Sequence, residues 1–201
     1  MTGRRTIVAS MKIKHSFFAI GLIILFAACE TTFLPKPKGY NRINMPEVGY
    51  VLLPDTFPYQ FEYSQNALLL KDTSWLSERY WIDIHYPDFE AFVQITYKPI
   101  NKDSLVDGYL ADSYRLTSQH NVKAYAIEEK ILLLQSGNVA SVSELEGDVP
   151  TQFQFHITDS SKHFLRGALY FQTATKNDSL KPAIDFIKND LVHLLNTLTW
   201  Q

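Results

Sequence analysis

Two histidines, one acid and one serine lie around a predicted turn in the C-terminal half of the chain: His156, Asp159, Ser160 and His163. If the flanking segments form an antiparallel pair, both imidazoles come near Asp159, and the group could hold a metal ion or activate Ser160 as a nucleophile. However, Asp and Ser also cap hairpin turns, and polar residues that alternate with aromatic ones mark the solvated face of a strand. We therefore expect a structural turn and keep a hydrolase or metal-binding site as the alternative.

Better-defined enzyme signatures are absent from the sequence. It contains no Gly-x-Ser-x-Gly nucleophile elbow, no glycine-rich phosphate loop and no His-Glu-x-x-His metal motif. We therefore expect a protein that is not an enzyme, with no catalytic residue, no metal and no cofactor.

Cys29 is the only cysteine of the chain, and it follows an apolar segment that ends in two alanines. Residues 17–28 have the length of a signal-peptide core and are shorter than the ~20 residues of a spanning helix. A thiol at this point can be alkylated by a lipid before cleavage. The pattern predicts a lipoprotein signal peptide over residues 1–28, which is removed, and a lipid on Cys29 that anchors the protein to a membrane.

The remaining chain is long enough for one domain and a tether. Removing residues 1–28 takes away four basic residues and no acid, which leaves 15 basic against 21 acidic side chains. This balance argues against nucleic acid as a partner. Residues 29–48 hold the lipidated cysteine and a proline-rich tether without helix or strand period, and residues 49–201 are expected to form a single globular domain.

Three residues of the tether, Gly39, Tyr40 and Arg42, are candidates for contact with a partner. Tyrosine and arginine are frequent at interface hot spots, and here they follow two prolines that stiffen the approach. A simple spacer would need only length and polarity. That spacer remains the alternative interpretation of this segment.

Hydrophobic alternation with period two predicts strands through most of the domain. The segments expected to form strands lie near residues 61–63, 67–70, 81–86, 92–98, 124–135, 139–145, 152–158 and 164–173. Arg166 lies inside the last of these strands. Because a buried charge is unfavourable unless it is paired, we expect an ion pair with an acid such as Asp83 or Asp112.

Two helices complete the pattern. The first runs from Asp103 or Ser104 to about Gln119 and is expected to carry one apolar stripe through the spacing Leu105, Tyr109, Asp112 and Leu116. The second is capped by Ser179 and has a continuous apolar stripe that buries against the sheet. Its members are Leu180, Ile184, Ile187, Leu191, Leu194 and Leu198.

The element order predicts an α+β domain. It combines an antiparallel β-sheet of about six to seven strands with one mid-chain helix and one C-terminal amphipathic helix packed on it. Whether both helices cover one face of the sheet, or one helix covers each face, stays open. Order and size resemble PsbP-like domains, which have a three-layer α/β/α arrangement.

Several motifs, spread over the whole mature chain and in a fixed order, resemble one known family. They are Leu34-Pro35-Lys36-Pro37-Lys38-Gly39-Tyr40-Asn41-Arg42, Ile95-Thr96-Tyr97-Lys98-Pro99, His120 followed by Lys123-Ala124, Glu146-Gly147-Asp148-Val149-Pro150, Thr158-Asp159-Ser160, His163-Phe164-Leu165-Arg166-Gly167-Ala168-Leu169-Tyr170 and Asn177-Asp178-Ser179-Leu180. On these residues the chain resembles the gliding motility lipoprotein GldD family of the Bacteroidetes. The resemblance brings no catalytic residue or cofactor with it.

What the resemblance implies is a periplasm-facing lipoprotein required for gliding motility and the associated type IX secretion system. Its partners would be the membrane, through the lipid on Cys29, and other gliding or secretion proteins. Only one acid, Glu30, follows the cysteine directly, so the acidic signal that exports some lipoproteins to the cell surface is absent. The inner leaflet of the outer membrane is therefore favoured, with the outer leaflet of the cytoplasmic membrane as the other location. The competing function is a periplasmic hydrolase or metal-binding protein that uses the His156, Asp159, Ser160 and His163 cluster.

Overall fold

A computed structural model describes residues 43–201 of the chain, apart from residue 103 and residues 173–176. The predicted signal peptide and the candidate residues Cys29, Gly39, Tyr40 and Arg42 lie outside the described residues. The predicted boundaries of tether and domain therefore stay predictions. At the start of the described chain, Ile43 packs against the hydrophobic core.

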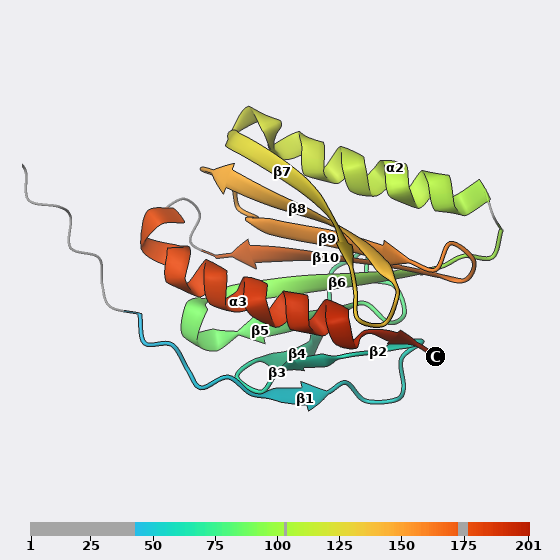
Figure 1. The fold of residues 1–201 in the computed structure, drawn as a ribbon, viewed down its shortest axis with the longest axis horizontal. Helices are drawn as coiled ribbons and strands as arrows, with labels where there is room; N and C mark the ends of the chain where they lie inside the picture. Colours follow the sequence, from blue (N-terminus) through green and yellow to red (C-terminus); the bar gives the residue numbers. More distant parts are fainter. Residues whose placement is uncertain (1–42, 103, 173–176) are drawn as a thin grey trace, which may run out of the picture. The chain divides into compact units, whose positions relative to one another are not determined.

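A seven-stranded antiparallel sheet forms the centre of the domain (Figure 1). Its strands, in spatial order, are β4 (Leu68–Lys71), β5 (Ile82–Tyr86), β6 (Ala91–Pro99), β10 (His163–Phe171), β9 (Phe153–Thr158), β8 (Val139–Gly147) and β7 (Ala124–Leu133). The predicted sheet of about six to seven strands is confirmed. Strands that alternate buried and exposed residues, such as β5 and β6, match the period-two pattern of their sequences.

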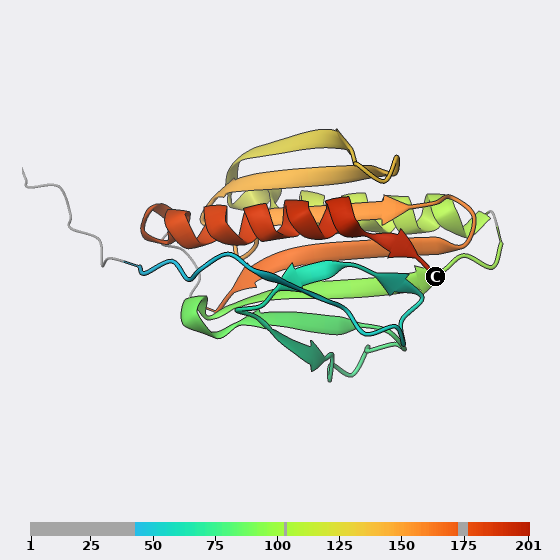
Figure 2. The same ribbon diagram turned by 60° about the horizontal axis from the view of Figure 1, so that its bottom comes forward.

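The two long helices lie on opposite faces of this sheet, which settles the alternative left open by the sequence. α2 (Ser104–Ser118) is followed by the short helix η2 (Gln119–Val122), and α3 (Asn177–Thr197) follows the last strand of the sheet. Ser113 of α2 contacts His156 on one face, whereas Lys188 of α3 pairs with Glu144 on the other. Figure 2 shows α3 in front of the sheet and α2 behind it.

Short elements, of which only the strand expected near residues 61–63 was predicted, complete the α3 side of the domain. β1 (Tyr50–Leu52) pairs with β3 (Glu62–Ser64), and β2 (Tyr59–Gln60) pairs with β11 (Thr199–Trp200). A short helix, η1 (Pro87–Phe89), makes the turn between β5 and β6. Apart from β3, these strands of two or three residues are too short to show an alternation of their own.

The core lies between the sheet and α3. The predicted apolar stripe of this helix is buried, with Ile187 and Leu191 at most 1 % exposed. Large aromatic side chains from the short strands and the sheet, including Tyr59, Phe61 and Phe153, fill the space beneath it. Each aromatic side chain removes on the order of 150–250 Å² from water, so this layer provides much of the stabilising burial.

The predicted apolar stripe of α2 is wrong. Asp112 is exposed and Leu116 is 37 % exposed, whereas the small polar residues Ser113 and Thr117 are buried at 4 % and 5 %. α2 turns these two side chains toward polar residues of the sheet instead of an apolar surface. A pattern based on apolar residues therefore selects the wrong side of this helix.

Candidate functional site

The structure does not assemble the predicted histidine cluster. Because Phe164 pairs with Thr158 across the last hairpin, His156 is opposite Arg166 and on the α2 face of the sheet. His163 alternates to the α3 face, where its Nδ1 lies 2.9 Å from the Tyr97 hydroxyl. The expectation that both imidazoles come near one acid is therefore wrong.

Asp159 instead organises the hairpin turn. Its Oδ1 accepts backbone N–H hydrogen bonds from Ser161, Lys162 and His163 at 2.8–3.0 Å. Burial alone would raise the pKa of Asp159, but these donors lower it to about 2. Ser160 follows with a left-handed φ of 59° and donates its backbone N–H to the Thr158 hydroxyl. Within residues 43–102, 104–172 and 177–201, no three His, Cys, Asp or Glu residues are close enough to hold a metal ion together.

Polar residues of strands β8 to β10 form a buried layer beneath α2. The Ser113 hydroxyl lies 3.1 Å from Nδ1 of His156, and the Thr117 hydroxyl donates to Oε1 of Gln154 at 3.0 Å. Tyr109, nearer the start of α2, packs on Phe164. Burial, and secondarily the charge of Arg166, lowers the pKa of His156. This face was expected to be solvated, but the helix excludes water from much of it.

Arg166 lies in this layer and lacks the acidic partner that was expected. Its guanidinium donates to Oε1 of Gln154 and hydrogen-bonds to Tyr170. Asp112 pairs with Arg115 instead, and Asp83 forms no ion pair among the described residues. Nε of Arg166 and Nε2 of Gln154 are both buried without a hydrogen-bond partner. The expected ion pair is wrong, and the cluster has more donors than acceptors.

Beside this layer, the same side of the sheet is not covered by a helix. In Figure 1, α2 follows the β7–β9 side of the sheet and leaves β4 and β5 free. We call the uncovered surface the open face, and its residues, which share one side through the strand registers, are Leu68, Leu70, Asp83, His85, Phe92, Gln94 and Tyr170. Leu68 is 54 % exposed and Leu70 41 %, and His85 stacks on Phe92 with ring centroids 4.2 Å apart.

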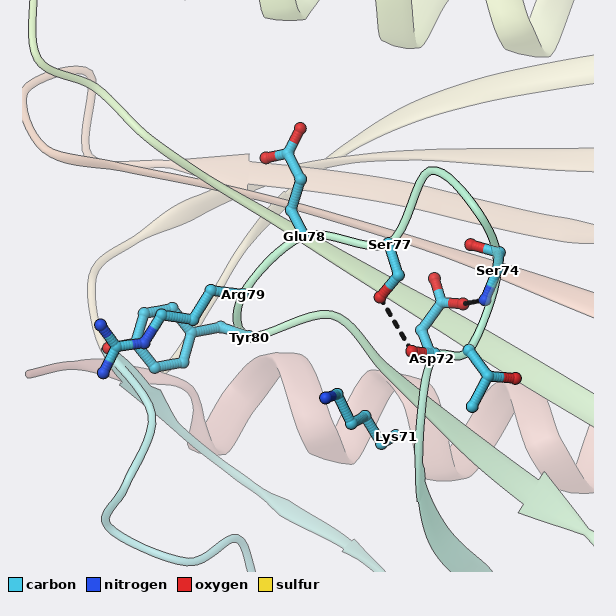
Figure 3. A pocket seen from close by; sticks show the side chains of 8 residues that line it. Lys71, Asp72, Ser74, Ser77, Glu78, Arg79 and Tyr80 are labelled. Carbon is cyan, nitrogen blue, oxygen red and sulfur yellow. Dashed lines mark hydrogen bonds between the residues drawn. The ribbon is translucent and has the colours of Figure 1, made fainter.

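A separate depression of about 550 Å³ lies in the β4–β5 loop, and Figure 3 shows its lining from Lys71 to Tyr80. Its polar groups hold the loop itself: the Ser77 hydroxyl donates to the carbonyl of Asp72, and the carboxylate of Asp72 accepts from the Ser74 backbone N–H. Glu78 pairs with Lys98 of β6. The Ser77 hydroxyl and the Asp72 carboxylate therefore stabilise the loop. Among the described contacts of these lining residues, neither serine hydroxyl is bonded to a side chain that could act as its base.

Trp75, at the tip of this loop, is 91 % exposed. It was not singled out from the sequence, because an isolated tryptophan between polar residues gives no periodic signal. Exposed tryptophan is a frequent anchor of interfaces, so the loop is a second surface feature of the domain.

Taken together, these features define a three-layer α+β domain with a helix on each face of an antiparallel sheet and a half-open sheet surface. A family profile described as gliding motility lipoprotein GldD matches residues 30–200, which is nearly the whole chain after Cys29. The protein belongs to this family of gliding motility lipoproteins.

Two further comparisons complete this finding. Among solved structures, the chain is similar to cyanobacterial PsbP (CyanoP) from Synechocystis sp. PCC 6803, with 14 % sequence identity and a TM-score of 0.47 over 82 % of this chain and 99 % of that one. A search of curated proteins found no match. In the described part of the chain, neither helix is long and apolar enough to cross a membrane.

Proposed function

We propose that the protein is a periplasm-facing, lipid-anchored component of an envelope complex that supports gliding motility and type IX secretion. The observation that carries this proposal is the family match over residues 30–200, which begins directly after the candidate lipidation site Cys29. Lipid on Cys29 holds the domain at a membrane, and the inner leaflet of the outer membrane is favoured because the residues directly after the cysteine, Glu30-Thr31-Thr32, contain a single acid.

The proposed role within that complex is assembly or stabilisation, without catalysis. The four residues that could have formed a catalytic or metal site serve other contacts: His156 bonds Ser113, His163 bonds Tyr97, Asp159 caps the turn, and Ser160 donates its backbone N–H to Thr158. A hydrolase needs a nucleophile and a base within hydrogen-bond reach of each other. Ser113 and His156 lie within that reach, but Ser113 is only 4 % exposed beneath α2. Ser160, the predicted nucleophile, bonds Thr158 through its backbone N–H and forms no described hydrogen bond to a histidine. The predicted cluster therefore gives no support to the hydrolase alternative.

Complementation of a deletion strain tests the proposal. Wild-type protein should restore spreading on agar and secretion of type IX cargo, whereas Cys29→Ser should lose membrane retention and restore neither. Mass spectrometry of the mature N-terminus reports the lipid directly. An unmodified Cys29 in the membrane fraction, or full motility without the gene, would contradict the proposal.

A second variant separates assembly from catalysis. Ser160→Gly removes the hydroxyl at a left-handed backbone position that glycine adopts without strain, so the fold should be kept. Full gliding and secretion with this variant are expected for a non-enzymatic component. Loss of both functions in a normally folded, anchored Ser160→Gly protein would favour the hydrolase alternative.

A further inference from the structure

The guanidinium of Arg166 has an excess of donors over acceptors. An arginine carries five N–H donors, and the described residues that accept from it are Gln154 and Tyr170. No described acid forms an ion pair with it, and Nε remains without a partner. Burying a cation without an opposite charge is unfavourable, so this arrangement lowers the stability of the free domain. The packing of the free domain does not explain why a cation occupies this position.

The open face gives access to this cation. Tyr170, which bonds Arg166, belongs to the open face. It pairs with Phe92 on the neighbouring strand β6. Arg166 as a residue is only partly buried, although its Nε is not accessible, and its bond to Tyr170 brings the guanidinium to the border of the open face. The surface next to it combines exposed leucines, the His85–Phe92 stack and the exposed amide of Gln94. An apolar and aromatic surface with a single cation at its border has the composition of a protein-binding site.

We propose that the open face docks a segment of a protein partner that places an aspartate or glutamate carboxylate on Arg166 and apolar side chains against Leu68, Leu70 and Phe92. The inference rests on the proposed assembly role, for which it specifies the chemistry of the partner. Arginine and carboxylate form charge-assisted hydrogen bonds in a fixed geometry, which would supply the opposite charge that no described acid gives Arg166 in the free domain.

The charges around Arg166 favour a single carboxylate over a free phosphate. Lys98, the lysine of the neighbouring strand β6, is paired with Glu78, so Arg166 is the arginine or lysine of β6 and β10 that has no acidic partner among the described residues. Asp83 lies on the same open face and would repel a dianion. Burial, and then the nearby Asp72, raise the pKa of Asp83, but its carboxylate remains an acceptor without a partner on one oxygen. A free phosphate would also make no favourable contact with the apolar side chains next to Arg166.

The first experiment examines the subsite in the mature, lipidated chain in detergent. Only four arginines follow residue 28, so ¹⁵N-arginine labelling gives at most four Nε signals. At constant ionic strength, sodium acetate should shift the Arg166 signal saturably relative to chloride, and Arg166→Lys should remove that signal. An Arg166 signal that ignores acetate, or that responds to inorganic phosphate alone, overturns the proposal.

The second experiment examines the partner in living cells. A photo-crosslinking residue at the exposed Gln94 should capture one partner peptide that contains Asp or Glu, as read by mass spectrometry, whereas the same probe at Lys181 of α3 should not. Arg166→Gln should lower the yield about tenfold, which corresponds to ~1.4 kcal/mol of binding. Arg115→Gln, which changes an exposed arginine of α2, should leave the yield unchanged.

Stability measurements keep these outcomes interpretable. Because Arg166→Gln removes a poorly compensated, partly buried charge, its urea midpoint should equal or exceed that of the wild type. A large loss of stability would show that Arg166 is a structural residue, and equal crosslinking with and without Arg166 would show that the carboxylate contact does not exist; either result overturns the proposal. Neither result affects the lipid anchor and the gliding phenotype, which test the proposed function separately.

Discussion

The hydroxyl of Tyr86 donates a hydrogen bond of 3.2 Å to Oδ2 of Asp190 across 104 positions of sequence. Tyr86 ends β5 and Asp190 lies in α3, and both are at most 3 % exposed. Tyr50 also bonds the same carboxylate. Burial raises the pKa of Asp190 in spite of these donors. Each hydrogen bond to the carboxylate therefore helps to stabilise its charged form. One buried carboxylate thus connects the sheet, α3 and the N-terminal strands.

Tyr86→Phe should destabilise the domain by about 1–3 kcal/mol, because it removes a donor from a buried carboxylate and leaves no water to replace it. Urea unfolding followed by circular dichroism at pH 7 measures the change. Tyr114→Phe is the matched control, since Tyr114 is 64 % exposed. Equal midpoints for Tyr86→Phe and the control would contradict the importance of this contact.

Gly167→Ala should destabilise the domain by roughly 1–3 kcal/mol through overpacking. A Cβ at this position would lie 2.3 Å from two ring atoms of Phe155, on the neighbouring strand. Gly108→Ala is the control, because no atom lies within 4 Å of its Cβ, and alanine in a helix should stabilise by up to ~1 kcal/mol. Thermal unfolding of the two variants should therefore shift in opposite directions.

Leu191→Ala should destabilise the domain by about 2–5 kcal/mol, the usual range for truncating a buried leucine. Leu191 is 1 % exposed at the centre of the α3 stripe, whereas the adjacent Val192 is 36 % exposed and provides the control variant Val192→Ala. Chemical unfolding compares the two. A Leu191→Ala protein that unfolds at the control midpoint would mean that α3 packs differently from the described structure.

Stability should fall as the pH falls below about 6.5. Burial lowers the pKa of His156, His120 and His163 from the ordinary value of 6.5. The unfolded chain therefore takes up protons before the folded domain does, and acid favours unfolding below pH 6.5. Urea midpoints at pH 7.5 and 5.5 measure the loss, and His156→Gln should reduce it. An unchanged difference between the two pH values in this variant would contradict the role of His156.

Gly39, Tyr40 and Arg42 remain candidates for contact with a partner, outside the described residues. Tyr40→Ala combined with Arg42→Ala should weaken gliding and secretion in a protein that is normally anchored and folded. Exchange of residues 35–42 for a Gly/Ser stretch of equal length separates contact from spacing, and it stops before Ile43 because that residue packs on the core. Full function after the exchange would show that the segment is only a spacer.

Strong periodic patterns allowed much of the fold to be predicted. The α3 stripe is buried as expected from Ile184 to Leu198, although the helix begins at Asn177, before the predicted cap Ser179. Strands β5 to β10 lie within two residues of the predicted segments at most ends. Both patterns depend on apolar side chains that must be excluded from water. Tertiary packing buries the same side chains, so it agrees with the prediction.

The α2 side of the sheet could not be predicted in the same way. Its layer is built from Ser113, Thr117, Gln154 and His156, residue types that alternate on solvated surfaces as well. Only tertiary contacts decide that these groups bond each other instead of water. The same limit explains why His156 and His163 appeared to be neighbours, since their separation depends on the exact register of the hairpin.

The pairing of β2 with β11 has a consequence for the order of events during export. Thr199 and Trp200 bond to Gln60 and Tyr59, and Trp200 also stacks on His163. This closure joins segments about 140 positions apart, so it belongs to the slow, non-local class of contacts. A polypeptide threaded through a membrane from its N-terminus cannot make it until Trp200 has emerged. For the exported protein that we propose, the domain therefore closes only after translocation.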